Sequence, residues 1–196
     1  MGSDLEDLRP NVVMWEHSKE YILPGEISYL EIMEGIESDE VSRPLMTLFR
    51  IGCDVRDSES LRKLINEIKA DSSERSSASK RINLNLKKYL EVVWPDFDQN
   101  IQVSLESDQM LVQIFDPNCE DPSHFQMDER SQGCQTFLSF LLTVAAESTY
   151  GVIRDTLLLL DEPETHLHPS GVRFMLAQLI DASKSCLLYT SDAADE

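Results

Sequence analysis

Four consecutive leucines, Leu157 to Leu160, are followed directly by two carboxylates and a proline. A short run of large apolar residues without polar alternation is typical of a strand buried on both faces, as in the middle of a parallel sheet. Asp161 and Glu162 would then stand at the carboxyl end of this strand, where open α/β sheets bind their ligands, and Pro163 would end it. The sequence therefore predicts an α/β fold with a parallel sheet at its core.

Two adjacent acids in that position suit the hydrolysis of a nucleoside triphosphate. One carboxylate, that of Asp161, would help to hold Mg²⁺, usually through a water molecule. Neighbouring side chains of a strand point to opposite sides, so Glu162 would be left to orient or deprotonate the attacking water. The alternative is that both are ordinary surface acids at the end of a strand.

A second motif, Ser131-Gln132-Gly133, precedes a predicted helix. The apolar residues Phe137, Phe140, Leu141 and Val144 recur at helical spacing, which predicts a buried amphipathic helix that runs to about residue 148. Ser131 is a good N-cap, and the free N–H groups at a helix start form a site for anions. The alternative is that Ser131 only caps a core helix.

Together the two motifs carry a family resemblance. The stretch from Glu129 to Phe140, E-R-S-Q-G-C-Q-T-F-L-S-F, and the stretch L-L-L-D-E-P-E-T-H-L-H-P resemble the signature and Walker B motifs of ABC-type ATPases. Their sequences are most similar to those of the OLD (overcoming lysogenization defect) family and its AAA relatives. The resemblance covers roughly residues 95–185. It implies the C-terminal lobe of an ABC-type P-loop NTPase head, with a parallel sheet core, a helical subdomain and a β hairpin.

The resemblance also implies ATP and Mg²⁺ as cofactors, and a homodimer that closes on the nucleotide. His168 stands in the D-loop, at a position where transporters carry an aspartate. Three roles carry over to positions of this sequence, namely the metal-linked residue Asp161, the catalytic residue Glu162, and the nucleotide-contacting residues Ser131, Gln132, Gly133 and His168. A zinc site at His166 and His168 is an alternative, but no further ligands with suitable spacing accompany them.

The implied function is ATP binding and hydrolysis linked to DNA, in phage defence or DNA repair, with a possible Toprim nuclease outside this chain. Two alternatives remain. One is a non-catalytic ATP clamp or DNA-bridging module related to the structural-maintenance-of-chromosomes (SMC) heads, and the other is a degenerate fragment. A nuclease centre within this chain would need a further set of acids, which the single Asp-Glu pair does not supply.

The phosphate-binding loop Gly-x-x-x-x-Gly-Lys-[Ser/Thr] does not occur in the sequence, because none of its seven glycines precedes Lys-Ser or Lys-Thr. We therefore expect the ATPase to be complete only in a longer parent protein, and this chain alone to be inactive. Residues 186–196 resemble the translation of a sequencing adapter and are set aside as an artefact. The strand that would carry the family's switch histidine after Ser185 is accordingly expected to be absent.

Composition places the chain among water-soluble globular proteins. A hydrophobic content of 41% in 196 residues is enough for a core, and no run of eighteen apolar residues occurs, so we expect a cytoplasmic protein without membrane contact. The four cysteines have no framework spacing, which suits reduced thiols. The net charge is −19, and only residues 61–88 are basic, with 8 bases against 3 acids. Any contact with DNA would come from that segment, which is alternatively a solvated helix face.

Hydrophobic patterning divides the chain into a mixed strand and helical subdomain at 1–94 and a signature and Walker B lobe at 95–185. A polar run at 70–79, with five serines, is expected to be a flexible or helix-bridging connector. The remaining expected elements are a strand at 12–15, an extended stretch at 21–26, helices near 28–36, 42–51, 59–70 and 78–93, a hairpin of 101–105 with 110–115, and a loop at 116–127.

Overall fold

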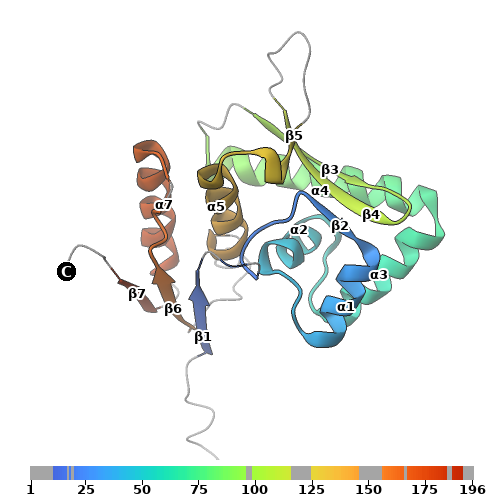
Figure 1. Cartoon of the computed structure of the whole chain (residues 1–196), viewed down its shortest axis with the longest axis horizontal. Helices are drawn as coiled ribbons and strands as arrows, with labels where there is room; N and C mark the ends of the chain where they lie inside the picture. The colour runs from blue at the N-terminus through green and yellow to red at the C-terminus, as the bar shows by residue number, and fades with distance from the viewer. Residues whose placement is uncertain are drawn as a thin grey trace, which may run out of the picture.

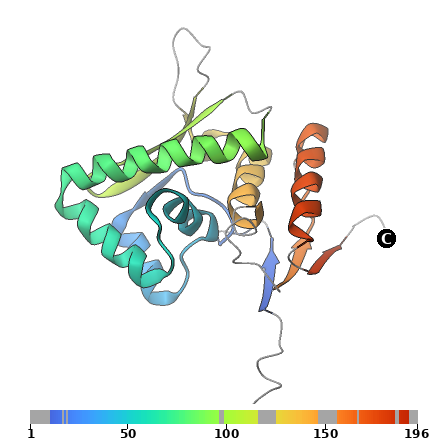
Figure 2. The same ribbon diagram turned by 180° about the vertical axis from the view of Figure 1, so that it is seen from behind.

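The computed structural model describes residues 11–16, 18, 20–95, 99–115, 125–145, 156–165, 167–184 and 187–191. They form a parallel sheet and an antiparallel sheet with helices packed between and around them (Figures 1 and 2). The parallel sheet has the order β1 (Asn11–Trp15), β6 (Thr156–Asp161), β7 (Leu187–Ser191). The antiparallel sheet comprises β2 (Glu26–Ser28), β4 (Gln109–Phe115) and β3 (Asn100–Leu105), with the short strand β5 (Phe125–Gln126) beside β4.

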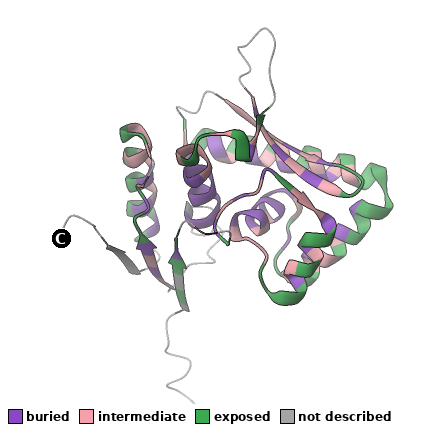
Figure 3. Cartoon of the chain, viewed as in Figure 1, coloured by how far each residue is buried: buried purple, intermediate pink, exposed green. Residues whose placement is uncertain are grey.

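The leucine run forms the strand β6, as predicted, between β1 and β7 in the parallel sheet. Leu158 and Leu160 are buried, and Leu160 lies in register with the buried Trp15. The predicted burial of the leucine run on both faces is only half met, because Leu157 and Leu159 are half-buried. Val12 and Met14 of β1, which lie in register with them, are 52% and 47% exposed (Figure 3). The described chain therefore covers one face of this sheet.

A strand follows Ser185, although none was predicted there. Strand β7 pairs in parallel with β6, and Leu187 lies opposite Leu157. It was not predicted because residues 186–196 were set aside, although the run from Leu187 to Thr190 has the apolar and β-branched residues of a strand. The strand contains no histidine, so the expected switch histidine does not occur in it. Ser191 occupies the position opposite Asp161.

The helices of the first half follow the sequence closely. They are α1 (Tyr29–Ser38), α2 (Arg43–Cys53), α3 (Ser58–Ala70) and α4 (Ser72–Val93). Ser28 and Asp57 cap α1 and α3 with reciprocal side-chain bonds, which explains where these helices begin.

The serine-rich run at 70–79 is not a flexible connector, and it contains the junction between two helices, as the alternative expectation had it. The link between α3 and α4 is Asp71 alone, whose side chain accepts a bond from Ser73 N and so caps α4. Arg75 Nη1 donates to the carbonyls of Ile68 and Lys69, and Ala78 is buried. Serine has a lower helix propensity than alanine, but the cap, the arginine and the buried face outweigh this preference.

The predicted hairpin is confirmed as β3 and β4, and it belongs to a larger sheet. Strand β2 pairs with β4, just as β1 pairs with β6, so both sheets combine strands from either side of position 94. Helix α4 lies along the outer edge of β3, where the Asn83 amide bonds both the N–H and the carbonyl of Val103, at 2.7 and 2.8 Å.

The predicted signature helix is α5 (Gln132–Phe140), which continues as a π-helical turn, η2 (Leu141–Ala145). Its expected end near residue 148 lies outside the described residues. Every residue from Thr136 to Val144 is buried, so the helix is enclosed rather than amphipathic (Figure 3). Helix α7 (Pro169–Ala182) packs against η2, over the same face of the parallel sheet (Figure 1). None of the described helices is long and apolar enough to cross a membrane.

Helices α2 and α4 approach closely at Gly52. A β carbon on Gly52 would lie 2.6 Å from Ile82 Cα, in addition to a clash with Ile82 Cγ1. Gly35 in α1 is less restricted, because a β carbon there would have Val41 Cγ2 as its nearest neighbour, 3.4 Å away. The backbone of α4 cannot retreat without disturbing its contact with β3.

We expect Gly52→Ala to lower the free energy of unfolding by about 1–3 kcal/mol, because the added methyl group forces the two helices apart. Gly35→Ala is the matched control, and we expect it to change stability by no more than about 1 kcal/mol, since alanine favours a helix. Urea denaturation of both variants measures the difference. Equal effects would contradict the close approach.

Candidate nucleotide-binding site

The start of α5 is built as an exposed helix N-terminus. Ser131 is the N-cap, and its Oγ accepts a bond from Cys134 N at 3.4 Å. Gln135 Nε2 donates to the carbonyls of Asp128 and Arg130, at 3.1 and 2.7 Å, and so fixes the preceding turn. Ser131 and Gln132 are exposed and Gly133 is half-buried. Free N–H groups and the positive end of the helix dipole favour an anion here.

Arg130 and Cys134 lie next to this turn. The Arg130 guanidinium donates to Gln99 Oε1 at 2.8 Å and lies over the Phe125 ring at 5.6 Å. Burial raises the pKa of the Cys134 thiol, against the opposing effect of Arg130, so the thiol stays protonated at neutral pH. No local sequence pattern signals the Arg130–Gln99 pair, because its partners lie 31 residues apart.

The end of β6 presents both predicted acids to solvent. Asp161 and Glu162 are exposed, whereas Pro163 is buried and closes the strand. The chain turns back at once, with Thr165 N donating to Glu162 O at 3.0 Å and Thr165 Oγ1 to Glu162 Oε2 at 3.2 Å.

Glu162 has a backbone φ of 41°, in the left-handed region. Two other described non-glycine residues have a positive φ, Asp39 and Asp54, and both are helix C-caps, where aspartate is well tolerated. A glutamate at such a position is unusual and costs about 1–2 kcal/mol. Strained residues of this kind concentrate at functional sites. The backbone conformation therefore makes Glu162 a candidate functional residue independently of the sequence motif.

His168 is the N-cap of α7. Its Nδ1 lies 3.1 Å from Ser170 Oγ and 3.5 Å from Ser170 N, so the local contacts of His168 are those of a capping residue. His166 lies outside the described residues. Among the residues that are described, no three His, Cys, Asp or Glu side chains lie together as a metal cluster.

The six predicted residues thus form two groups on separate elements. Asp161, Glu162 and His168 belong to the β6–α7 connection, while Ser131, Gln132 and Gly133 belong to the start of α5. Because α7 links two parallel strands, its first turn lies on the side of the β6 carboxyl end. An exposed carboxylate at that end fits Mg²⁺, which takes one or two protein carboxylates and completes its shell with water and phosphate.

No protein-family model and no curated protein matches this chain. Two solved SMC head structures are similar to it. A structure of the SmcHead bound to the C-winged helix domain of ScpA has 16% identity and a TM-score of 0.44, and the match covers 82% of this chain and 44% of that one. The Smc head domain with an extended coiled coil, bound to the C-terminal domain of ScpA derived from Pyrococcus furiosus, has 18% identity, a TM-score of 0.37 and coverage of 83% and 45%. The chain spans less than half the length of both.

We expect Glu162→Gly to be more stable than Glu162→Ala by about 1 kcal/mol, because only glycine adopts the left-handed conformation without strain. Both substitutions remove the carboxylate and its bond to Thr165, so their difference isolates the backbone. Thermal or urea unfolding measures it. A glycine variant that is less stable than the alanine variant would contradict the strain at this position.

Proposed function

We propose that this chain supplies the signature and Walker B residues of an ABC-type ATPase head that binds Mg·ATP between two subunits. The observation that carries the proposal is the exposed Asp161-Glu162 pair at the carboxyl end of a parallel strand, with Glu162 in a strained conformation. The exposed start of α5, capped by Ser131, supports it as a second anion site.

Each residue has a chemical task in this proposal. Bound Mg²⁺ would neutralise phosphate charge, and Asp161 would hold it, directly or through water. Glu162 would take the proton of the attacking water, and the tight turn at Thr165 fixes the direction of its carboxylate. Ser131 and the first N–H groups of α5 would contact the γ-phosphate. The resemblance to ABC-type ATPases implies that a second copy of the chain would complete each site.

The proposal requires a phosphate-binding loop, which the printed sequence lacks, from another segment or polypeptide. The open face of the parallel sheet is consistent with this requirement. Sheets of this type are normally covered on both faces, whereas Val12 and Met14 face outward here. A second layer that brings the loop would also bury these side chains.

The link to DNA is a finer part of the proposal. The basic residues of α3 are partly neutralised, since Arg62 pairs with Glu37 and Glu59, and Lys63 pairs with Glu67. Lys80 and Lys88 of α4 carry no ion pair with any described residue. Contact with DNA would therefore use α4. The proposals of a role in phage defence and of a coupled Toprim nuclease rest only on the sequence resemblance of the two motifs to those of the OLD family.

A second candidate function is an SMC-like clamp, in which ATP binding closes two heads and turnover is not required for the mechanical role. Both functions use the same residues. They differ in Glu162, which is the general base of the ATPase, whereas the mechanical role of the clamp does not require turnover.

The test uses a polypeptide in which a phosphate-binding lobe is joined to this chain, such as a longer natural protein that contains the sequence. We expect Glu162→Gln to lower kcat for ATP hydrolysis about 100-fold or more, because it removes the general base. ATP-dependent dimerisation, measured by light scattering, should persist in this variant. Ser131→Arg should abolish dimerisation, because its side chain fills the anion site.

Glu164→Gln is the matched control, since this exposed acid lies two residues away and has no role in the proposal. Unchanged turnover in Glu162→Gln would refute its assignment as the base. Dimerisation without turnover in the unsubstituted protein would identify the clamp instead.

A further inference from the structure

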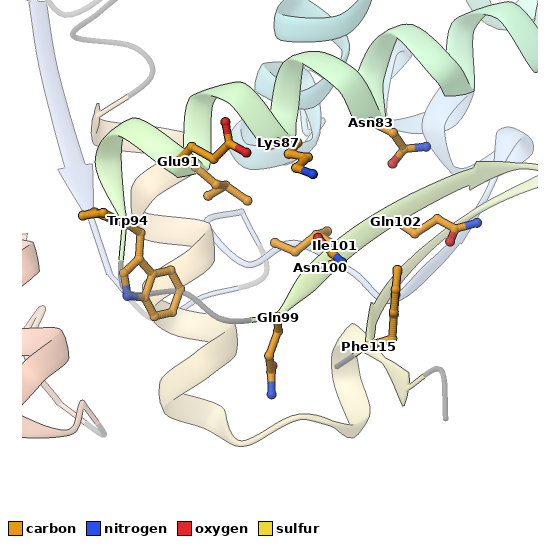
Figure 4. Close-up of a pocket in the computed structure, with 11 residues that line it drawn as sticks. Asn83, Lys87, Glu91, Trp94, Gln99, Asn100, Ile101, Gln102 and Phe115 are labelled. Atoms are coloured by element: carbon orange, nitrogen blue, oxygen red, sulfur yellow. The ribbon is translucent and has the colours of Figure 1, made fainter. Parts of the chain in front are cut away.

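A pocket of about 350 Å³ opens between the C-terminal half of α4 and the start of β3 (Figure 4), and Asp161 and Glu162 do not line it. The helix and the strand lie close together at Asn83 and diverge toward Trp94 and Gln99. The pocket lies in this wedge and has the size of a small-ligand site. Neither the motifs nor the proposed ATPase chemistry uses it.

The edge of β3 offers unpaired backbone groups to this pocket. Val103 directs its N–H and carbonyl away from β4, because both are bonded by the Asn83 amide on α4. In an antiparallel ladder these directions repeat every second residue, so the N–H and carbonyl of Ile101 also point to the α4 side. Ile101 lines the pocket, and no described side chain bonds its backbone.

Asn83 shows which chemistry fits such a pair. Its planar amide presents one donor and one acceptor side by side and satisfies both groups of a single strand residue, at 2.8 and 2.7 Å. A ligand at Ile101 needs the same adjacent donor and acceptor on a flat edge. Nucleobases carry this pattern on their Watson–Crick edges.

The pocket walls suit a flat aromatic ring. Trp94 and Phe115 lie at opposite sides of the pocket (Figure 4). The Trp94 indole is held by an edge-to-face contact with Phe137 of α5, with ring centroids 4.5 Å apart. Stacking on such side chains is a common way to hold a base.

The rim of the pocket carries an exposed cation. Lys87 lies over the pocket and has no ion pair with any described residue, while the Glu91 carboxylate points away from β3 (Figure 4). Lys87 is thus placed to meet a phosphate group on the ligand. The volume of the pocket, about 350 Å³, suits a small nucleotide.

We infer that this pocket binds the base of a free nucleoside or mononucleotide, with the backbone of Ile101 pairing with the base edge and Lys87 facing the phosphate. The site is independent of the proposed ATPase function. Magnesium is not needed for binding, because Asp161 and Glu162 take no part in it.

The experiment titrates adenosine, guanosine, cytidine, uridine and AMP into the full chain in EDTA by calorimetry. We expect at least one nucleoside to bind at submillimolar concentration. Ile101→Pro should weaken binding at least tenfold, because it removes the outward N–H and leaves the bonds to β4 intact, as proline is tolerated at a strand edge. Ile101→Ala is the matched control, which loses the side chain but retains the N–H, and should stay within threefold of the original.

The phosphate contact is tested separately. AMP should bind several-fold tighter than adenosine, and Lys87→Met should remove this difference, whereas Lys88→Met on the adjacent exposed position should not.

Three results would overturn the inference. They are the absence of binding by all four nucleosides at millimolar concentration, equal effects of the proline and alanine substitutions at Ile101, and a single-stranded oligonucleotide binding more tightly than AMP at physiological salt. The last result would show that the pocket binds a base within a nucleic acid strand and not a free nucleotide. Circular dichroism of each variant confirms that it is folded.

Discussion

The enclosure of α5 and η2 is the constraint on which the rest of the structure depends. Trp15 of the parallel sheet packs edge-on against Phe140, with ring centroids 5.7 Å apart, and Trp94 of the α4 end packs against Phe137. A helix with no solvent face must have its polar groups satisfied by its neighbours. Ser139 Oγ accepts a bond from Leu23 N at 2.9 Å, and the Leu141 carbonyl accepts one from Tyr89 at 2.8 Å. The parallel sheet, the end of α4 and the segment before β2 are thereby fixed to one helix.

This arrangement also explains where the candidate site residues lie. Since the body of α5 is fully enclosed, its first turn is the part of the helix that reaches solvent, with Ser131 and Gln132 exposed. The β6 strand is central in its sheet, and its exposed acids, Asp161 and Glu162, stand at its carboxyl end. The proposed function would require the enclosed helix and the central strand to hold these end residues in place.

The sequence predicted those parts that depend on local patterns. The leucine run, the helices near 28–36 and 59–70, and the alternating hairpin were recognisable because hydrophobic periodicity acts over a few residues. Helix α4 begins earlier than predicted, because Arg75 bonds the end of α3 and Ala78 is buried, and the local sequence shows neither. Strand β7 was not predicted because its segment was set aside on account of its origin and its residues were not analysed.

The candidate site divides in the same way. Residue types and spacing made Asp161, Glu162 and Ser131 candidates, but they did not predict the left-handed conformation of Glu162, which depends on the turn that Thr165 closes. The contacts of Arg130 with Gln99 and of Trp94 with Phe137 join segments far apart in the chain, and no local pattern marks them. His168 caps α7 directly before Pro169, which is a favoured residue at a helix start.

The bond of Asn83 to the edge of β3 has a consequence for how the protein behaves at high concentration. An unpaired strand edge is a template on which another chain adds its own strand, and such growth leads to aggregates. By occupying both backbone groups of Val103, a single side chain on a neighbouring helix takes away the central pairing position of that edge. Ser79, whose hydroxyl also donates to Val103 O at 2.6 Å, reinforces the barrier. The resistance of the antiparallel sheet to aggregation through its β3 edge thus depends on a polar residue of α4 rather than on any residue of the strands.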